Sequence, residues 1–291
     1  MNKEPINWAL WKCRCSAISK MMAQSAQNAP LTDKQEIELA ELEARPTRTA
    51  KMELRVAELV EKRDRSKDVV LSDSCISYLV EAYAWETEKM FSITKEMDVE
   101  YFDRGRQTEP ESVELLSFVD DAIYLKNEMR FENEFLSGIP DIVRMDSQEP
   151  IVTGIRDIKS CKDYPTFLYK MHKGLDAGNR EQLAGYGDIL QCGDLEVDFT
   201  LPTMPESIRN GYKMKLAYKM DEVSTESPRF LKAWAELERS MIFDHIDPRK
   251  RVYKIPVSPF EKSEQLAVYE RVKHCREWLF NFDISFNKLN Q

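Results

Sequence analysis

The chain has 291 residues, long enough to bury a large core as one elaborated domain or as two. Hydrophobic residues make up 42% of it and charged residues 32%, as in ordinary soluble proteins; no apolar run reaches the roughly eighteen residues of a membrane span, and the first residues lack the apolar core of a secretory signal. With 42 basic and 51 acidic residues the net charge is −9, which argues against broad, non-specific adhesion to nucleic acid but leaves room for a local basic groove.

The cysteines and histidines indicate neither a disulfide framework nor a zinc site. The six cysteines are scattered, and we expect them to stay reduced in the cytoplasm. They are Cys13, Cys15, Cys75, Cys161, Cys192 and Cys275. The histidines His172, His245 and His274 do not pair with cysteines at zinc-finger spacing, so we expect surface or core residues.

The first part of the chain is predicted to be helical. A helix over residues 7–27 would carry Ile18, Met21 and Met22, and a helical hairpin is expected over residues 31–68. Residues 33–44 hold one Lys against five acids, and residues 45–67 hold eight basic residues against four acids. Two interpretations of this hairpin stay open. It is either a solvated insertion or an arm that contacts DNA or another subunit through Arg45, Arg48, Lys51 and Arg55.

Two further helices are predicted before the first strand. One covers residues 72–96, with Ser72 or Asp73 as its cap. Gly105 is expected to break the chain before the second, which carries Leu116, Val119 and Ile123 on one stripe. Glu109 would then lie at the head of this helix with Pro110 in its first turn, where a carboxylate also satisfies free amides and the helix dipole.

The middle of the chain alternates between strands and helices. The expected sheet strands are 130–136, 139–145, 152–159 and 194–201, and the expected helices are 162–174 and 179–192. Asp157 and Lys159 are two apart, so they share one face of their strand while Ile158 points to the other. Phe167, Leu168 and Met171 are expected to be buried.

Beyond Pro205 the chain is predicted to be mostly helical. Val252 to Val257 is a candidate for a last strand at the sheet edge. The preceding Arg249-Lys250-Arg251 is the best phosphate-contact candidate in the second half of the chain.

Four motifs together carry a resemblance to a known family. They are Pro140-Asp141 followed about fifteen residues later by Asp157-Ile158-Lys159, Gly105 with Glu109-Pro110, Gln182 with Tyr186, and the Cys13–Met22 segment containing Ser16. In this order they resemble the PD-(D/E)xK nuclease superfamily, and most of all its YqaJ, lambda-exonuclease and RecB-type branch. The match spans roughly residues 11–190.

The resemblance implies a fold and a domain division. It implies an α/β fold with a restriction-endonuclease-like mixed sheet flanked by helices. We expect a nuclease core over residues 1–204, which includes the hairpin insertion 31–68, and a helical C-terminal extension over 205–291 that packs on the core.

The resemblance also implies roles for individual residues. Glu109, Asp141, Asp157 and the main-chain carbonyl of Ile158 would hold Mg²⁺, for which Mn²⁺ would substitute. Lys159 would orient or deprotonate the attacking water or stabilise the charged phosphate. Gln182 and Tyr186 would lie along the edge of the site, and Ser16 and Arg14 would lie near a DNA phosphate. Some RecB-type relatives hold an iron–sulfur cluster with one early cysteine and a C-terminal trio; only Cys275 lies near the C-terminus here, so we expect none.

The implied activity is metal-dependent hydrolysis of DNA, with exonucleolytic attack on double-stranded ends favoured, in recombination, repair or phage DNA metabolism. A single-strand annealing or recombination protein is a candidate partner, no membrane is involved, and the oligomeric state stays open because some relatives form rings around DNA. Two alternatives remain. One is a catalytically silent DNA-binding or scaffold relative, which would be expected to lack at least one of Glu109, Asp141, Asp157 and Lys159. The other is a sequence-specific endonuclease, for which no reading element is visible.

Overall fold

The computed structural model describes residues 5–24, 30–65, 70–90, 99–222 and 224–289. The chain divides into two compact units. The larger contains residues 14–16 and 91–265, and the smaller contains residues 1–13, 17–90 and 266–291.

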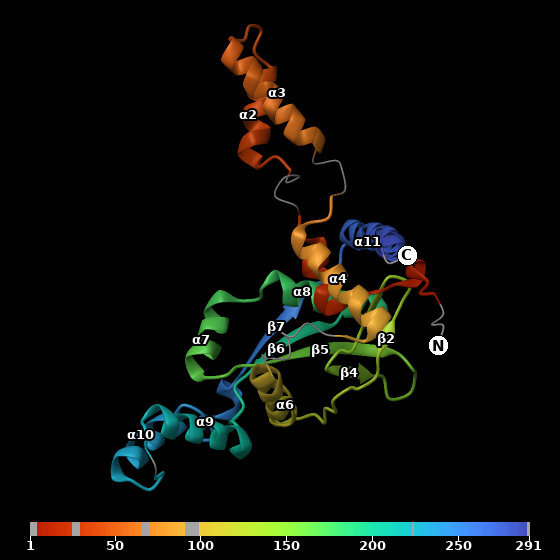
Figure 1. Cartoon of the computed structure of the whole chain (residues 1–291). Coiled ribbons are helices and arrows are strands. Elements are labelled where there is room, and N and C mark those ends of the chain that lie inside the picture. Colours follow the sequence, from red (N-terminus) through yellow and green to blue (C-terminus); the bar gives the residue numbers. More distant parts are fainter. Residues whose placement is uncertain (1–4, 25–29, 66–69, 91–98, 223, 290–291) are drawn as a thin grey trace. The chain divides into compact units, whose positions relative to one another are not determined.

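A four-stranded mixed sheet is the centre of the larger unit (Figure 1). Its strands, in spatial order, are β4 (Ile142–Met145), β5 (Val152–Ser160), β6 (Leu195–Thr200) and β7 (Val252–Val257). β5 and β6 are parallel, and the other two pairs are antiparallel. The mixed α/β architecture is therefore confirmed, and β7 takes the edge position that the Val252–Val257 pattern predicts.

The prediction of one sheet strand over residues 130–136 is wrong. The segment forms two short strands, β2 (Phe131–Glu132) and β3 (Leu136–Gly138), in a separate sheet of order β1-β3-β2, where β1 is Cys13–Arg14. The side chain of Asn133 causes the reversal, because its Oδ1 accepts hydrogen bonds from the amides of Phe135 and Leu136 at 2.9 and 2.8 Å.

Helices cover both faces of the main sheet. They are α6 (Val99–Asp120), α7 (Tyr164–Lys173) and α8 (Ala177–Leu190). Successive side chains of a strand point to opposite faces. Ile158 packs in one buried cluster with Val113 and Leu116 of α6, whereas Asp157 on the other face accepts a hydrogen bond from Gln182 of α8. Asp157 and Lys159 of β5 therefore lie on the α8 face of the sheet.

α6 differs from its prediction because Gly105 does not end a helix. The helix begins at Val99 and continues through Pro110, so Glu109 lies within it and not at its head. Proline removes one backbone donor and crowds the preceding turn. Two side-chain hydroxyls donate to main-chain carbonyls one turn back in this part of the helix. Thr108 donates to the Arg104 carbonyl at 2.9 Å, and Ser112 donates to the Thr108 carbonyl at 3.1 Å. Two carbonyl groups that precede Pro110 in the helix therefore have a side-chain donor.

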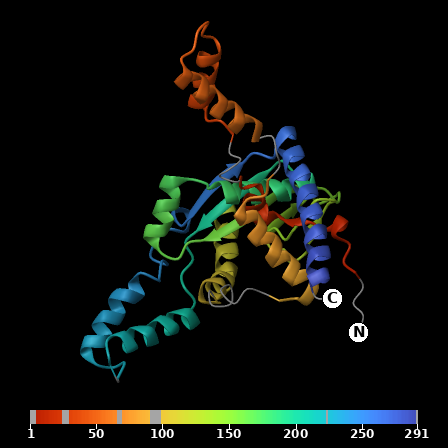
Figure 2. The same ribbon diagram turned by 45° about the horizontal axis from the view of Figure 1, so that its top comes forward.

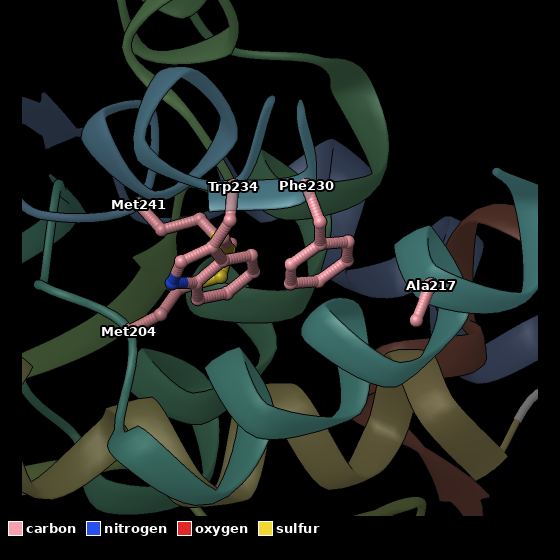
Figure 3. Close-up of a cluster of buried hydrophobic side chains, with 5 residues drawn as sticks. All are labelled: Met204, Ala217, Phe230, Trp234 and Met241. Atoms are coloured by element: carbon pink, nitrogen blue, oxygen red, sulfur yellow. The ribbon is translucent and has the colours of Figure 1, made fainter. Parts of the chain in front are cut away.

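A helical pair, α9 (Glu206–Lys219) and α10 (Pro228–Arg239), follows β6 with a hydrophobic core of its own. Figure 3 shows this core, in which the rings of Trp234 and Phe230 of α10 lie between the two methionines on one side and Ala217 on the other. Its other buried members are Met204, Ala217 and Met241. The Ser207 hydroxyl donates to Gln107 Oε1 at 2.6 Å, so the start of α9 is tied to α6.

The smaller unit is helical and is organised around Tyr83. It contains the 3-10 helix η1 (Trp8–Leu10), α1 (Ile18–Met22), α4 (Asp73–Glu88) and most of α11 (Lys262–Leu289). Tyr83 stacks on Trp8 at a ring distance of 5.3 Å and donates a 2.7 Å hydrogen bond to Asp283. No helix within the described ranges is long and apolar enough to cross a membrane.

The single helix predicted over residues 7–27 is wrong for residues 7–24, because β1 interrupts it, and residues 25–27 lie outside the described residues. Cys13 and Cys15 are buried and Arg14 between them is exposed, which is the alternation of a strand. The helix predicted over 72–96 is confirmed as α4 up to Glu88, where Lys89 in the left-handed region ends it. Residues 91–96 of that prediction lie outside the described residues.

The helical hairpin is confirmed as α2 (Asp33–Glu43) and α3 (Ala50–Arg65). It buries Leu31, Leu39 and Leu59 in a small cluster of its own. Arg55 binds both oxygens of Glu38 at 2.9 Å, which makes it an internal link between the two arms and not a free phosphate contact.

The structure does not divide at residue 204. β7 pairs with β6 over its whole length, so residues 252–257 complete the sheet of the larger unit, while most of α11 belongs to the smaller unit. The C-terminal segment therefore contributes to both units.

We expect the hairpin to be dispensable for folding, because its buried side chains contact one another and loop closure costs little. Replacing residues 33–66 by a short Gly/Ser linker should give a soluble protein whose Tm lies within about 5 °C of the parent. The measurement is thermal unfolding followed by circular dichroism. Insoluble product, or a much lower Tm, would show that the hairpin is part of a larger core.

Candidate active site

A pocket of about 730 Å³ opens at the end of β5 where α6, α7 and α8 meet. The pocket is lined by Asp141, Asp157 and Lys159, and also by Glu109 and Gln182. The structure therefore brings five residues from distant parts of the sequence to one place.

Asp157 and Lys159 lie on the α8 face of β5. Asp157 is only 2% exposed, and its Oδ2 is 2.7 Å from the Lys159 ammonium. Its other oxygen accepts a 3.1 Å hydrogen bond from the Gln182 amide. β5 pairs with β4 on one side and β6 on the other, so the strand that carries both charged groups is held along both edges.

Asp141 immediately precedes β4 and reaches across to β5. The Ile158 amide donates to Asp141 Oδ2 at 2.7 Å. Because Ile142 is paired with Arg156 in the antiparallel register, the residue before β4 comes opposite the Asp157–Ile158 step. The sheet register thus places the second carboxylate beside the first.

Burial disfavours the charged forms of both carboxyl groups. Burial and the neighbouring Asp157 charge raise the pKa of Asp141 to about 7, although the Ile158 amide and Lys159 act in the opposite direction. Burial also raises the pKa of Asp157, against the attraction of Lys159. For Lys159, burial lowers the pKa but the Asp157 and Asp141 charges more than offset it, and the net shift is upward.

This donor set fits a divalent cation of the magnesium type. Among the described residues, no group of three or more His, Cys, Asp or Glu side chains is arranged to hold a metal. Mg²⁺ commonly binds through only one or two carboxylates and keeps several waters. Asp141 and Asp157, with the Ile158 carbonyl that the family resemblance implies, match that requirement, and a cation would relieve the repulsion between the two acids.

Glu109 lies in the same pocket but its carboxylate is ion-paired with Lys126. Its side chain is 16% exposed, at the surface of the site. Glu109 therefore lines the pocket near its surface, and its partner Lys126 is a residue that the sequence did not indicate.

Gln182 and Tyr186 are one turn apart on α8, as predicted, and Gln182 lines the pocket. The Gln182 amide donates to both Asp157 and the Tyr186 hydroxyl, each at 3.1 Å. Tyr186 packs against Gly138, where an added Cβ would lie 2.2 Å from its ring. Gly138 of β3 is therefore required for the close approach that seats Tyr186.

The N-terminal candidates belong to the larger unit. Arg14 and Ser16 are both exposed, on either side of the buried Cys15. Cys15 lies close enough to Tyr186 to contribute, after burial and the Asp157 charge, to raising the pKa of that phenol. Arg14 and Ser16 are therefore sequence neighbours of a residue near Tyr186, but neither of them lines the pocket.

The basic triplet at 249–251 divides into two roles. Arg249 and Lys250 are exposed in the 3-10 helix Pro248–Lys250. Arg251 is only 5% exposed and donates to the Leu201 carbonyl at 2.9 Å and to Glu111 at 2.8 Å. The prediction of Arg251 as a phosphate contact is therefore wrong, because its guanidinium is committed to joining α6 to the end of β6.

Several polar pocket residues were missed from the sequence. They are Arg104, Arg106, Lys162, Thr166, Lys170 and Asn179. Lys162 follows the Asp157–Lys159 strand by three residues, and Arg106 lies beside Gly105 of a recognised motif. Proximity to these motifs was the available signal.

No protein-family model matches the chain, and no curated protein matches it in sequence. Two solved structures share its fold. One is a phage-related exonuclease from Haemophilus somnus 129PT, with a TM-score of 0.58 and 16% identity over 95% of this chain and 96% of that one. The other is an alkaline exonuclease from Laribacter hongkongensis, with a TM-score of 0.51 and 10% identity over 97% and 98%. The expected nuclease-type fold is confirmed.

The paired acids predict a pH dependence of stability. Because the folded-state pKa of Asp141 is raised from 3.8 to about 7, the folded chain holds its proton more tightly than the unfolded chain does. Stability should therefore fall as pH rises from about 4 to about 7 and then level off. Asp141→Asn keeps an acceptor for the Ile158 amide and removes the charge. The free energy of unfolding of this variant minus that of the parent should therefore increase between pH 5 and pH 8.

The measurement is urea unfolding in EDTA at a series of pH values. Asp146→Asn is the control, since main-chain donors lower the pKa of that exposed carboxyl. A constant difference between Asp141→Asn and the parent from pH 5 to pH 8 would contradict the coupling of the two acids.

Proposed function

We propose that this chain is a metal-dependent deoxyribonuclease that hydrolyses phosphodiester bonds, and that it acts as an exonuclease on double-stranded ends. The observation that carries the proposal is the Asp141–Asp157 pair with Lys159 at the floor of the pocket. Both structures that share the fold are described as exonucleases, which supports the same activity.

The charges around the pocket suit a phosphodiester substrate despite the overall charge of −9. Five basic and four acidic residues line it. The basic residues are Arg104, Arg106, Lys159, Lys162 and Lys170, and the acidic ones are Glu109, Asp141, Asp157 and Asp176. Cationic side chains at the rim attract a polyanion, and the carboxylates on the floor suit a cation.

The residues of the candidate site would have different roles in hydrolysis. Asp141, Asp157 and the Ile158 carbonyl would hold Mg²⁺ or Mn²⁺, with Glu109 completing the shell directly or through water. The ion would supply Lewis-acid polarisation of the phosphate and a more acidic water. The Lys159 ammonium, held 2.7 Å from Asp157, is placed to donate a hydrogen bond to the attacking water or to a phosphate oxygen. Gln182 fixes the orientation of Asp157, and Ser16 and Arg14 are candidates for contact with a neighbouring phosphate.

The silent-relative alternative is disfavoured by the residues themselves. Glu109, Asp141, Asp157 and Lys159 are all present and all line the pocket. We therefore retain hydrolysis as the function. A single-strand annealing or recombination protein remains the proposed partner, and DNA recombination, repair or phage DNA metabolism the proposed setting.

Linear duplex DNA should be degraded in Mg²⁺ or Mn²⁺ and not in EDTA, because Asp141 and Asp157 would hold the cation that polarises the phosphate. Gel analysis of linear and covalently closed circular DNA of the same sequence measures this. Digestion that persists in EDTA would sink the metal mechanism. Equal attack on closed circles would favour an endonuclease.

Asp157→Ala should reduce cleavage by roughly a hundredfold or more while DNA binding stays intact or tightens, since it removes a metal ligand and a negative charge. Lys159→Ala should also abolish turnover yet retain metal binding. The readouts are single-turnover cleavage and DNA affinity, with Glu149→Ala on the exposed β4–β5 loop as the control. Near-native activity of the Lys159 variant would contradict the role proposed for Lys159 in hydrolysis.

A further inference from the structure

α7 has an exposed surface that the hydrolytic mechanism does not use. In both views the helix lies at the outer side of the sheet, with one side that no other element of the larger unit covers (Figures 1 and 2). Only Phe167 of its ten residues is fully buried. Leu168 and Met171, which the sequence pattern predicts to be buried, are 45% and 43% exposed, because α7 meets the sheet through a narrow edge.

One flank of α7 continues the wall of the pocket. Thr166 and Lys170 both line the pocket. Tyr169 and Lys173 lie beside them at helical spacings of three and four residues. We call these four residues the α7 strip. Its members come from one helix face, with Lys173 about one turn beyond Lys170 toward the end of the helix.

The strip combines an exposed aromatic ring with cations. Tyr169 is 59% exposed. No acidic residue occurs between Tyr164 and Leu175. Lysines in a last turn also favour the helix dipole, which accounts for positive charge at this end of the helix. It does not account for an exposed tyrosine beside them. Lys170 faces the pocket, where its ammonium lies 3.5 Å from Asp176.

Cations that follow a backbone next to an aromatic ring are the features by which proteins bind single-stranded nucleic acid. Every base can stack on a ring, and lysines neutralise the phosphates. A protein partner would not require the cationic flank to be continuous with a pocket that already suits a phosphate.

We propose that the α7 strip binds unpaired nucleotides of the strand whose phosphate lies in the pocket, with a base on Tyr169 and phosphates at Lys170 and Lys173. The inference rests on the proposed nuclease function and adds a strand-binding surface to it. Thr166 to Lys173 spans about 10 Å of helix, which corresponds to roughly three stacked nucleotides.

The test compares two double variants with the same chemical changes. Tyr169→Ala with Lys173→Gln removes the ring and one cation of the strip. Tyr218→Ala with Lys219→Gln makes the same changes on α9, where Tyr218 is 90% exposed but neither residue lines the pocket. Tyr169→Phe with Lys173→Arg retains stacking and charge and serves as the rescue variant. The Tm of each variant checks folding.

Affinity for a fluorescein-labelled twelve-nucleotide single strand is measured by anisotropy in EDTA, so that no cleavage occurs. The α7 double variant should bind about tenfold more weakly, with a salt slope lower by about 0.7 for the lost phosphate contact. The α9 variant and the rescue variant should match the parent within about twofold.

Equal affinities for the parent and the α7 variant would overturn the inference, as would a parent protein that does not bind the strand. A change in solution mass of the α7 variant with unchanged affinity would also overturn it, in favour of a contact between copies. Cleavage of linear duplex by the parent in Mg²⁺ is measured in parallel. If the parent binds the strand but does not cleave, the hydrolytic function fails while the α7 inference stands.

Discussion

The closeness of two buried carboxylates is the constraint on which the rest of the site depends. Burial raises the pKa of both acids, and the Asp157 charge raises that of Asp141 further, so the fold must hold the two carboxyl groups together at a cost. It does so with the Ile158 amide on one acid and the Lys159 ammonium and Gln182 amide on the other. These contacts come from a strand register and one helix, both rigid elements, which suits a site that must bind a cation with fixed geometry.

The opposite face of the sheet carries a second charged cluster that holds α6 in place. Arg156 lies within 3.3 Å of Asp120, Glu196 and Asp198, and Tyr124 stacks under its guanidinium. Asp198 is fully buried, and burial raises its pKa to about 7 despite Arg156. Together with the Arg251–Glu111 pair, this cluster fixes the middle and end of the helix that carries Glu109. Alternation along β5 thus separates an anchoring face from a chemical face.

The charge of the molecule is unevenly distributed, and this explains how an acidic chain can suit DNA. The acids near the pocket lie at its floor or are paired with Lys126 and Lys170, whereas lysine and arginine form much of its rim. A substrate phosphate approaching the rim meets cations first. The net charge of the whole chain therefore says little about this pocket, because salt at physiological concentration screens exposed charges that lie farther away than about 8 Å.

The sequence by itself determined the features that depend on near neighbours in the chain. Alternation placed Asp157 and Lys159 on one strand face, and helical spacing placed Gln182 and Tyr186 on one helix face, as the structure has them. A local feature that the strand pattern did not reveal, the hydrogen bonds of Asn133 to the next residues, turned one expected strand into two. Tertiary structure alone decided which strand β7 pairs with, because β6 lies more than fifty residues earlier in the chain. Burial of Arg251 and exposure of Leu168 likewise depend on which elements pack nearby, and no local pattern encodes a partner that lies far away in the chain.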